Sequence, residues 1–272
     1  MSRTPTKRRS GPPPALEIRG VSLAFRGNSV LEDVDLTLQT QDFVGLIGPN
    51  GAGKTVLLKV ILGLLKPDRG SVHIFGEPAT AQHGMVAWVP QFAQFAADFP
   101  ISVRDVVHMG VLGDRRARLR SNKEAAQRVD EALAEVDLLD VQDRQVGKLS
   151  GGQIQRVLIG RALAQKTGIL LLDEPAASLD SRYGDDLYEL LRRLSKDRAV
   201  LLVSHDIGVL HRYVSSVACL NRRLTSHGSS EITQQMLEDT YGEHVDLVEH
   251  PHSHRLLGPH DQDALPETGE HN

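Results

Sequence analysis

The sequence predicts an α/β protein with a mainly parallel core sheet, an antiparallel β-subdomain near the N-terminus and an inserted helical subdomain. The apolar segment 43–47 runs directly into residues 48–55, GPNGAGKT, which fit the phosphate-loop pattern between a strand and a helix. Two more apolar segments, 169–172 and 199–203, lie on either side of a helical pattern at 182–194. Strands that alternate with helices after a phosphate loop are typical of parallel α/β cores.

Further strands are expected near the phosphate loop, because short apolar runs there alternate with polar residues or end at turn signals. Gly27-Asn28 is a hairpin turn signal between the first two of these runs. The expected strands lie at residues 16–25, 30–39, 71–75 and 85–89.

The stretch from about 92 to 165 has a polar, helix-forming composition, which indicates the helical subdomain. A helix is expected from Asn122 to Asp137. Its buried side should contain Val129, Leu133, Val136 and Leu139.

The two ends of the chain differ from this central domain of residues 15–228. Residues 1–14 are rich in Pro, Ser and Arg and are expected to be disordered. A C-terminal extension at 229–248 should contain one helix at 231–242, and the His-rich tail from 249 to 272 is expected to be unfolded on its own.

Composition excludes several classes of protein. The 31 basic and 35 acidic residues nearly balance, so no charge bias argues for a nucleic-acid partner. The single cysteine, Cys219, lies in an apolar run and is expected to pack in the core of a protein from a reducing cytoplasm. No apolar stretch approaches the ~18 residues that span a bilayer, and the basic N-terminus lacks the apolar region of a secretory signal.

The phosphate loop predicts a nucleoside triphosphate site. Its glycines allow close approach of the backbone, whose N–H groups then form an anion site at the start of a helix. Lys54 should reach the β and γ phosphates, and Thr55 should hold Mg²⁺. The apolar face of the following helix is expected to contain Val56, Leu57, Leu58, Val60, Ile61 and Leu64.

Two carboxylates follow the apolar strand at 169–172. Asp173 should lie beside the phosphate loop, where it can support Mg²⁺. Glu174 points elsewhere and suits a carboxylate that polarises the attacking water. The alternative, a strand that ends in solvent-facing acids, becomes unfavoured downstream of a phosphate loop.

A second anion-binding helix start occurs at residues 149–153, LSGGQ. Ser150 is a good N-cap, and Gly151 and Gly152 expose backbone N–H groups at the start of a patterned helix. The first site does not need this element. The economical explanation is a two-chain sandwich, in which this helix start closes on the γ-phosphate held by the partner's phosphate loop.

With these motifs in order, the sequence resembles the nucleotide-binding subunit of ATP-binding cassette (ABC) transporters over residues 15–228. The motifs that carry the resemblance are the phosphate loop, Gln91, LSGGQ, LLLDEP at 170–175, Ser178-Leu179-Asp180 and His205. The resemblance implies ATP hydrolysis with ATP and Mg²⁺ as cofactors. It also implies a homodimer formed on ATP binding, at the cytoplasmic face of the plasma membrane.

The resemblance assigns roles to individual positions. Phe25 would stack on adenine, Gln91 would contact Mg²⁺ and sense the permease, and Asp180 would lie across the dimer interface. Glu174 would be the general base, and His205 would contact the γ-phosphate. The nucleotide would be held by Gly48, Pro49, Asn50, Gly51, Ala52, Gly53, Lys54, Thr55 and Val56, together with Ser150, Gly151, Gly152 and Gln153 of the second chain. Phe25, Val56 and Trp88 depart mildly from the residues usual in the family.

Two segments resemble the zinc and manganese importer branch: residues 89–110, and residues 219–228 with Tyr241-Gly242. This branch uses a separate permease and, indirectly, a substrate-binding protein. The first segment is partly shared by ATPases for iron-chelate or cobalamin import, so those substrates stay open. A soluble ABC ATPase, such as an assembly factor, is the alternative from another class.

The tail adds an observation about metals. Six of the 12 histidines fall between 244 and 271, and His250, His252 and His254 alternate. Neutral imidazoles suit Zn²⁺ and its neighbours, so these three could bind a transition metal. The alternative is a solvated polar tail, because the spacing matches no closed four-ligand site.

Overall fold

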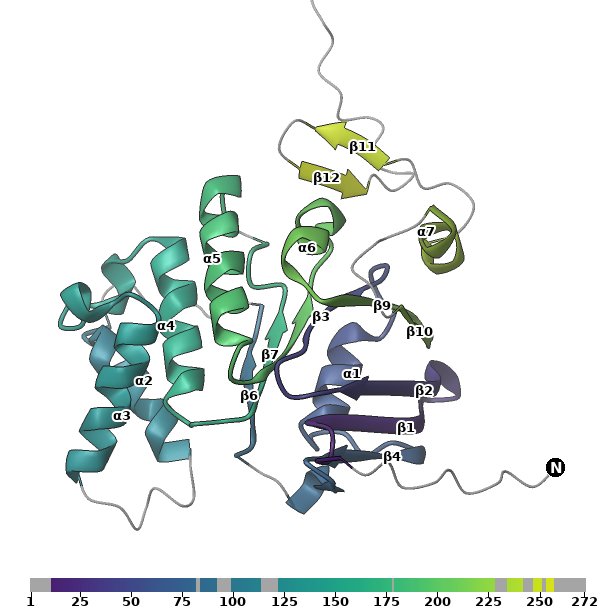
Figure 1. The fold of residues 1–272 in the computed structure, drawn as a ribbon, viewed down its shortest axis with the longest axis horizontal. Helices are drawn as coiled ribbons and strands as arrows, with labels where there is room; N and C mark the ends of the chain where they lie inside the picture. Colours follow the sequence, from purple (N-terminus) through teal and green to yellow (C-terminus); the bar gives the residue numbers. More distant parts are fainter. Residues whose placement is uncertain are drawn as a thin grey trace, which may run out of the picture.

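The computed structural model describes residues 11–81, 84–91, 99–113, 122–177, 179–227, 234–241, 247–250 and 253–256. The helices α2, α3 and α4 gather on one side of the core sheet, and the strands β1, β2 and β4 lie on the other (Figure 1). The helices are α1 (Lys54–Ile61), α2 (Val103–Gly113), α3 (Asn122–Glu135), α4 (Gly151–Leu163), α5 (Ser181–Leu194), α6 (Ile207–Tyr213) and α7 (Gln234–Tyr241). Short 3₁₀ turns occur at Ala79–Ala81, Leu139–Val141 and Val146–Lys148.

The core sheet confirms the predicted α/β class. Its strand order is β10-β9-β3-β8-β7-β6, and every pairing from β9 to β6 is parallel. Every residue of β3, β7 and β8 is buried, because both faces of a parallel sheet are covered. The strands are β3 (Phe43–Ile47), β6 (Val86–Val89), β7 (Ile169–Asp173), β8 (Ala199–Val203), β9 (Ser216–Asn221) and β10 (Arg223–His227).

The N-terminal sheet is antiparallel, as predicted, with the order β2-β1-β4-β5. Its turn lies one residue earlier than expected: Asn28 pairs with Phe25, so Arg26 and Gly27 form the loop. Both have positive φ, 49° and 83°, which matches the twist of a tight hairpin. The strands are β1 (Leu16–Phe25), β2 (Asn28–Leu38), β4 (Arg69–Ile74) and β5 (Glu77–Pro78).

Two leucines that the periodicity placed in the core are exposed. Helix α1 ends at Ile61, before the turn that would bury Leu64, and this side chain is 62% exposed. Leu139 is 45% exposed, because α3 ends at Glu135 and the chain then turns at Asp137, which has φ 58°. In both places the helical period was extended past the real end of the helix.

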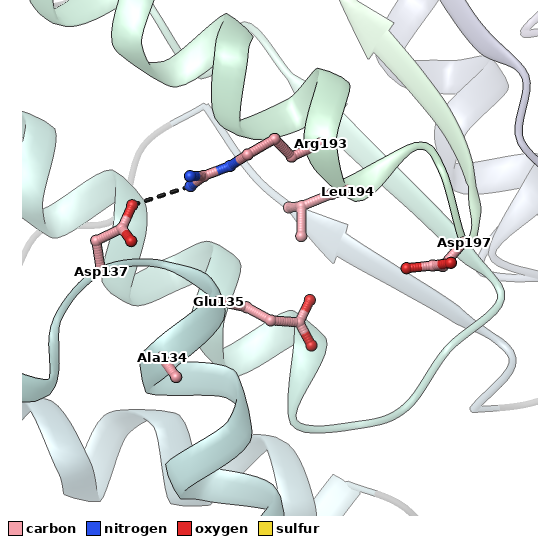
Figure 2. A pocket seen from close by; sticks show the side chains of 6 residues that line it. All are labelled: Ala134, Glu135, Asp137, Arg193, Leu194 and Asp197. Carbon is pink, nitrogen blue, oxygen red and sulfur yellow. Dashed lines mark hydrogen bonds and ion pairs between the residues drawn. The ribbon is translucent and has the colours of Figure 1, made fainter.

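Ion pairs connect the helical subdomain to the core near the end of α3 and the end of α5, and Figure 2 shows the one between Asp137 and Arg193. Asp137 Oδ2 accepts hydrogen bonds from Arg156 Nη1 at 2.8 Å and from Arg193 Nη2 at 2.9 Å. Arg198 Nη2 donates to Glu135 Oε2 at 3.0 Å. An open pocket of about 280 Å³ lies beside these ion pairs and is lined by Ala134, Glu135, Asp137, Arg193, Leu194 and Asp197.

The C-terminal part adds elements that the sequence did not predict. The apolar run around Cys219 is strand β9, where the thiol is buried, and β10 pairs with it. From residue 249 onward we expected no regular structure, but β11 (Leu247–His250) pairs with β12 (Ser253–Leu256), and β12 lies beside α6 (Figure 1). Such a hairpin is marginal alone, so contact with the domain explains the difference. No helix among the described residues is long and apolar enough to cross a membrane.

Candidate nucleotide site

The phosphate loop connects the buried strand β3 to α1. A Cβ built on Gly48 would lie 2.0 Å from the carbonyl oxygen of Leu220, so no side chain fits at this position. Gly51 and Gly53 have φ of 79° and 98°, which glycine adopts without strain. The loop therefore bends sharply and presents backbone at the start of α1, an arrangement that suits an anion. Asn50, Gly51 and Thr55 are exposed on it, Pro49 and Val56 are partly buried, and Ala52 is buried.

Lys54 is the first residue of α1 and is 7% exposed. Its ammonium group donates hydrogen bonds to the carbonyl oxygens of Gly48 at 2.6 Å and Pro49 at 3.0 Å. Burial lowers the pKa of Lys54, and the nearby carboxylates of Glu174 and Asp173 oppose this shift. The charge is thus held inside the loop, where phosphate oxygens could replace the two carbonyls.

Thr55 and Asp173 bring α1 and the end of β7 together. The Thr55 hydroxyl donates to Asp173 Oδ2 at 2.9 Å. Asp173 is 6% exposed, and burial raises its pKa despite that hydrogen bond. A hydroxyl and a buried carboxylate are the hard oxygen donors that Mg²⁺ prefers, and a cation would offset the cost of burying the charge. The residues present therefore fit a magnesium ion.

The Glu174 side chain contacts residues from two other segments of the chain. Its Oε2 accepts a hydrogen bond from Gln91 Nε2 at 3.0 Å and lies 3.3 Å from His205 Nδ1. The contact with His205 lowers the pKa of Glu174, against the effect of burial. Its backbone has φ 47° and donates from N–H to the Val203 carbonyl at 3.0 Å. A left-handed conformation is unfavourable for glutamate, and such strain is common at functional sites.

The LSGGQ segment forms a second group with the start of α5. Ser150 Oγ accepts from the Gln153 backbone N–H at 3.3 Å, and Gln153 Oε1 accepts from the Ser150 N–H at 3.1 Å, which completes a capping box. A Cβ on Gly151 would lie 3.4 Å from Leu179 Cδ2. Asp180 is exposed and directly precedes α5.

The remaining predicted positions lie apart from these contacts. Phe25 ends β1 and is 44% exposed, which leaves its ring free to stack on a planar base. His252 lies outside the described residues, and only the backbone of His250 and His254 is described, in β11 and β12. Among the described residues, no group of three or more His, Cys, Asp or Glu could hold a metal ion.

Two buried residues next to the His205 turn were not predicted from the sequence. Tyr188 on α5 and Ser204, which directly follows β8, are both buried, and their side-chain oxygens are 3.3 Å apart. The helical pattern at 182–194 did not single out Tyr188, although this residue lies one turn before Leu191 on the buried side of the helix. A tyrosine on an otherwise leucine-rich face was the available signal, because a buried hydroxyl requires a partner.

Comparisons with known proteins show that the chain is similar to one family. The family model described as ABC transporter matches residues 31–177. The manganese transport system ATP-binding protein MntB of Listeria innocua is 35% identical over 84% of this chain and 96% of its own length. The zinc transport system ATP-binding protein TroB of Treponema pallidum is 36% identical over 89% of this chain and 92% of its own length.

Solved structures show the same fold. An ATP-binding cassette of an ABC transporter in its ADP conformation superposes with a TM-score of 0.73 at 24% identity, covering 85% of this chain and 99% of the other. A chain of cbiO1 from Clostridium perfringens gives a TM-score of 0.71 at 24% identity, covering 80% of this chain and 89% of the other.

Proposed function

Because this chain belongs to the ABC transporter family and is an ATP-binding subunit with ATPase activity, we propose that it drives import of zinc or manganese through a separate permease. The observation that carries the proposal is its similarity to both manganese and zinc transport ATPases over more than four-fifths of its length. The absence of a membrane-spanning helix among the described residues is consistent with a separate permease.

The site supports a hydrolysis mechanism that depends on positioning and electrostatics. Lys54 would exchange its two carbonyl partners for phosphate oxygens. Thr55, Asp173 and Gln91 would hold Mg²⁺, which when bound neutralises phosphate charge. Glu174, ionised because its pKa is lowered, would accept a proton from the attacking water and orient it at the γ-phosphate. His205 would keep that carboxylate in place and contact the γ-phosphate.

The second group of residues would complete the site of another copy. Ser150 and Gly152 present a helix start with exposed backbone donors, which suits a γ-phosphate. Asp180, exposed beside them, would contact the partner chain. ATP would then close two copies head to tail, hydrolysis would release them, and the segment from Gln91 to Val103 would transmit the motion to the permease at the cytoplasmic face of the plasma membrane. A substrate-binding protein would deliver the cargo on the opposite face.

The test is reconstitution of this subunit with the permease that co-purifies with it. We expect ATP-dependent uptake of Zn²⁺ or Mn²⁺ into vesicles, and no uptake with the Glu174→Gln variant in the same preparation. Uptake of a ferric chelate or cobalamin instead would overturn the metal assignment but keep the transporter. Recovery of the chain without any membrane protein would favour the soluble alternative.

A further inference from the structure

A buried hydrogen bond anchors the residue that precedes His205. Tyr188 on α5 is 3% exposed, and its hydroxyl lies 3.3 Å from Ser204 Oγ. Ser204 is 5% exposed and directly follows the buried strand β8. Tyr188 and Ser204 come from distant parts of the chain. They meet because α5 packs against α6, and α6 begins just after the turn at His205 (Figure 1).

Ser204 anchors the turn that contains His205. Its backbone N–H donates to the Leu46 carbonyl at 3.3 Å, and its Oγ accepts from the Asp206 N–H at 3.1 Å. The chain is therefore held on both sides of His205. The His205 side chain itself is 46% exposed and reaches Glu174 Oε2 at 3.3 Å, at the long end of hydrogen-bond range. A small displacement of the turn would lengthen this contact further.

Tyr188 is itself held rigidly. Its ring stacks on Tyr213 of α6, with centroids 5.4 Å apart and planes at 14°. Burial raises the pKa of Tyr188 to about 12, so the hydroxyl keeps its proton at any working pH. A phenylalanine would fill this space without the cost of burying a hydroxyl, so the hydroxyl points to a role beyond packing.

We infer that Tyr188 is a positioning residue for ATP hydrolysis: through Ser204 it holds the His205 imidazole against Glu174. Helix α5, which carries Tyr188, begins immediately after Asp180. Movement of the Asp180 segment by a partner chain would thus reach His205 through a helix and one hydrogen bond. The inference rests on the catalytic roles proposed for Glu174 and His205.

The decisive experiment compares Tyr188→Phe with Tyr213→Phe by steady-state ATPase kinetics on the full-length protein. Each variant removes one hydroxyl from the same ring stack, but that of Tyr213 donates to the exposed Asp185 at 3.4 Å. For Tyr188→Phe we expect kcat to fall about 3- to 10-fold, the range for one lost hydrogen bond, with KM for ATP unchanged. Tyr213→Phe should keep both constants.

Ser204→Ala supplies a second, independent measurement. If the two hydroxyls act as one unit, the double variant Tyr188→Phe/Ser204→Ala should lose no more kcat than Ser204→Ala alone. Additive losses would overturn the inference. So would an unchanged kcat in Tyr188→Phe, or a loss that Tyr213→Phe shares.

The result can be separated from failure of the proposed mechanism. Normal turnover by Glu174→Gln would remove the proposed base, whatever Tyr188→Phe does. Slow turnover by Glu174→Gln together with normal turnover by Tyr188→Phe would refute only the positioning role. A lowered melting temperature with kcat intact at lower temperature would reduce Tyr188 to a packing residue.

Discussion

The Thr55 hydroxyl donates a hydrogen bond of 2.9 Å to Asp173 Oδ2, although the two residues are 118 positions apart in the chain. Thr55→Val keeps the shape of the side chain but leaves the buried carboxylate without this donor. A lost partner of a buried group costs about 1–3 kcal/mol, so we expect at least a ~5-fold loss of ATPase activity. Thr55→Ser keeps a hydroxyl at this position. In a titration of ATPase activity with Mg²⁺, it should therefore reach half-maximal activity at a lower Mg²⁺ concentration than Thr55→Val. Equal Mg²⁺ dependence in Thr55→Val and the unchanged protein would contradict the predicted site.

Replacement of Glu174 by Gln tests the proposed base. The amide keeps the size of the side chain but cannot accept a proton, and removal of a general base costs about 10²- to 10⁴-fold. We therefore expect ATP to bind with similar affinity while turnover falls by at least about 100-fold. Equilibrium binding of labelled ATP and phosphate release measure the two effects separately. Because bound ATP then persists, size-exclusion chromatography with ATP and Mg²⁺ should show a dimer, and near-normal turnover would refute the assignment.

The pH dependence of ATPase activity should report the contact between His205 and Glu174. The hydrogen bond from His205 is the main cause that lowers the pKa of Glu174 from 4.5, and burial opposes it. A lowered pKa keeps the carboxylate ionised until the pH falls through the lowered value. In His205→Ala the effect of burial is unopposed by histidine, so the acid limb of kcat should move to higher pH.

His205→Asn is the matched control, because its amide N–H can still donate to the carboxylate. Its acid limb should lie between those of the unchanged protein and His205→Ala. Superimposed acid limbs in all three proteins would show that His205 does not set the ionisation of Glu174.

Asp137 should contribute to the attachment of the helical subdomain. Burial opposes ionisation of Asp137, but hydrogen bonds from Arg193 and Arg156 outweigh it and lower the pKa. Asp137→Asn removes the charge and tolerates the φ of 58°. We expect a loss of about 0.5–1 kcal/mol in unfolding free energy, since the pairs are largely exposed. Thermal unfolding at low and high salt measures it, and the difference should shrink in high salt.

The control for Asp137 is Glu189→Gln. This change breaks a similarly exposed ion pair with Arg192, at 3.0 Å, inside α5 alone. It should leave stability almost unchanged. A loss as large as that of Asp137→Asn would mean that the ion pair across the boundary has no special role.

The stability that Asp137 contributes should also depend on pH, because its pKa is lowered in the folded protein. This contribution should be complete above the ordinary aspartate pKa and should disappear as the pH falls through the lowered pKa of Asp137.

The His-rich tail should bind a transition metal if His250, His252 and His254 act together. Calorimetric titration of Zn²⁺ into the full chain and into the triple His→Ala variant compares the two directly. We expect one additional binding event in the full chain, because three imidazoles suit Zn²⁺. A chain ending at Tyr241 keeps α7 and should behave like the triple variant. Equal Zn²⁺ binding by all three proteins would contradict the metal site and favour the alternative of a solvated polar tail.

Local sequence patterns predicted the strands and turns whose conformation depends on residues close to them in the chain. The strand at 43–47, the phosphate loop and the strands at 169–172 and 199–203 were predicted from apolar runs and turn residues, and the structure confirms the three strands. Element ends were less accurate. Leu64 and Leu139 continue a helical period, but the chain leaves the helix before either is buried.

The sequence by itself determined the α/β class, because strand and helix periods follow from local backbone geometry. It also predicted that Lys54, Thr55, Asp173 and Glu174 share one site, and the family resemblance added His205 to that prediction. Only the tertiary structure decided how these side chains meet: Gln91 and His205 both on Glu174 Oε2, and Tyr188 behind Ser204. Such contacts join residues distant in sequence. They depend on how helices pack on the sheet, which no local periodicity specifies.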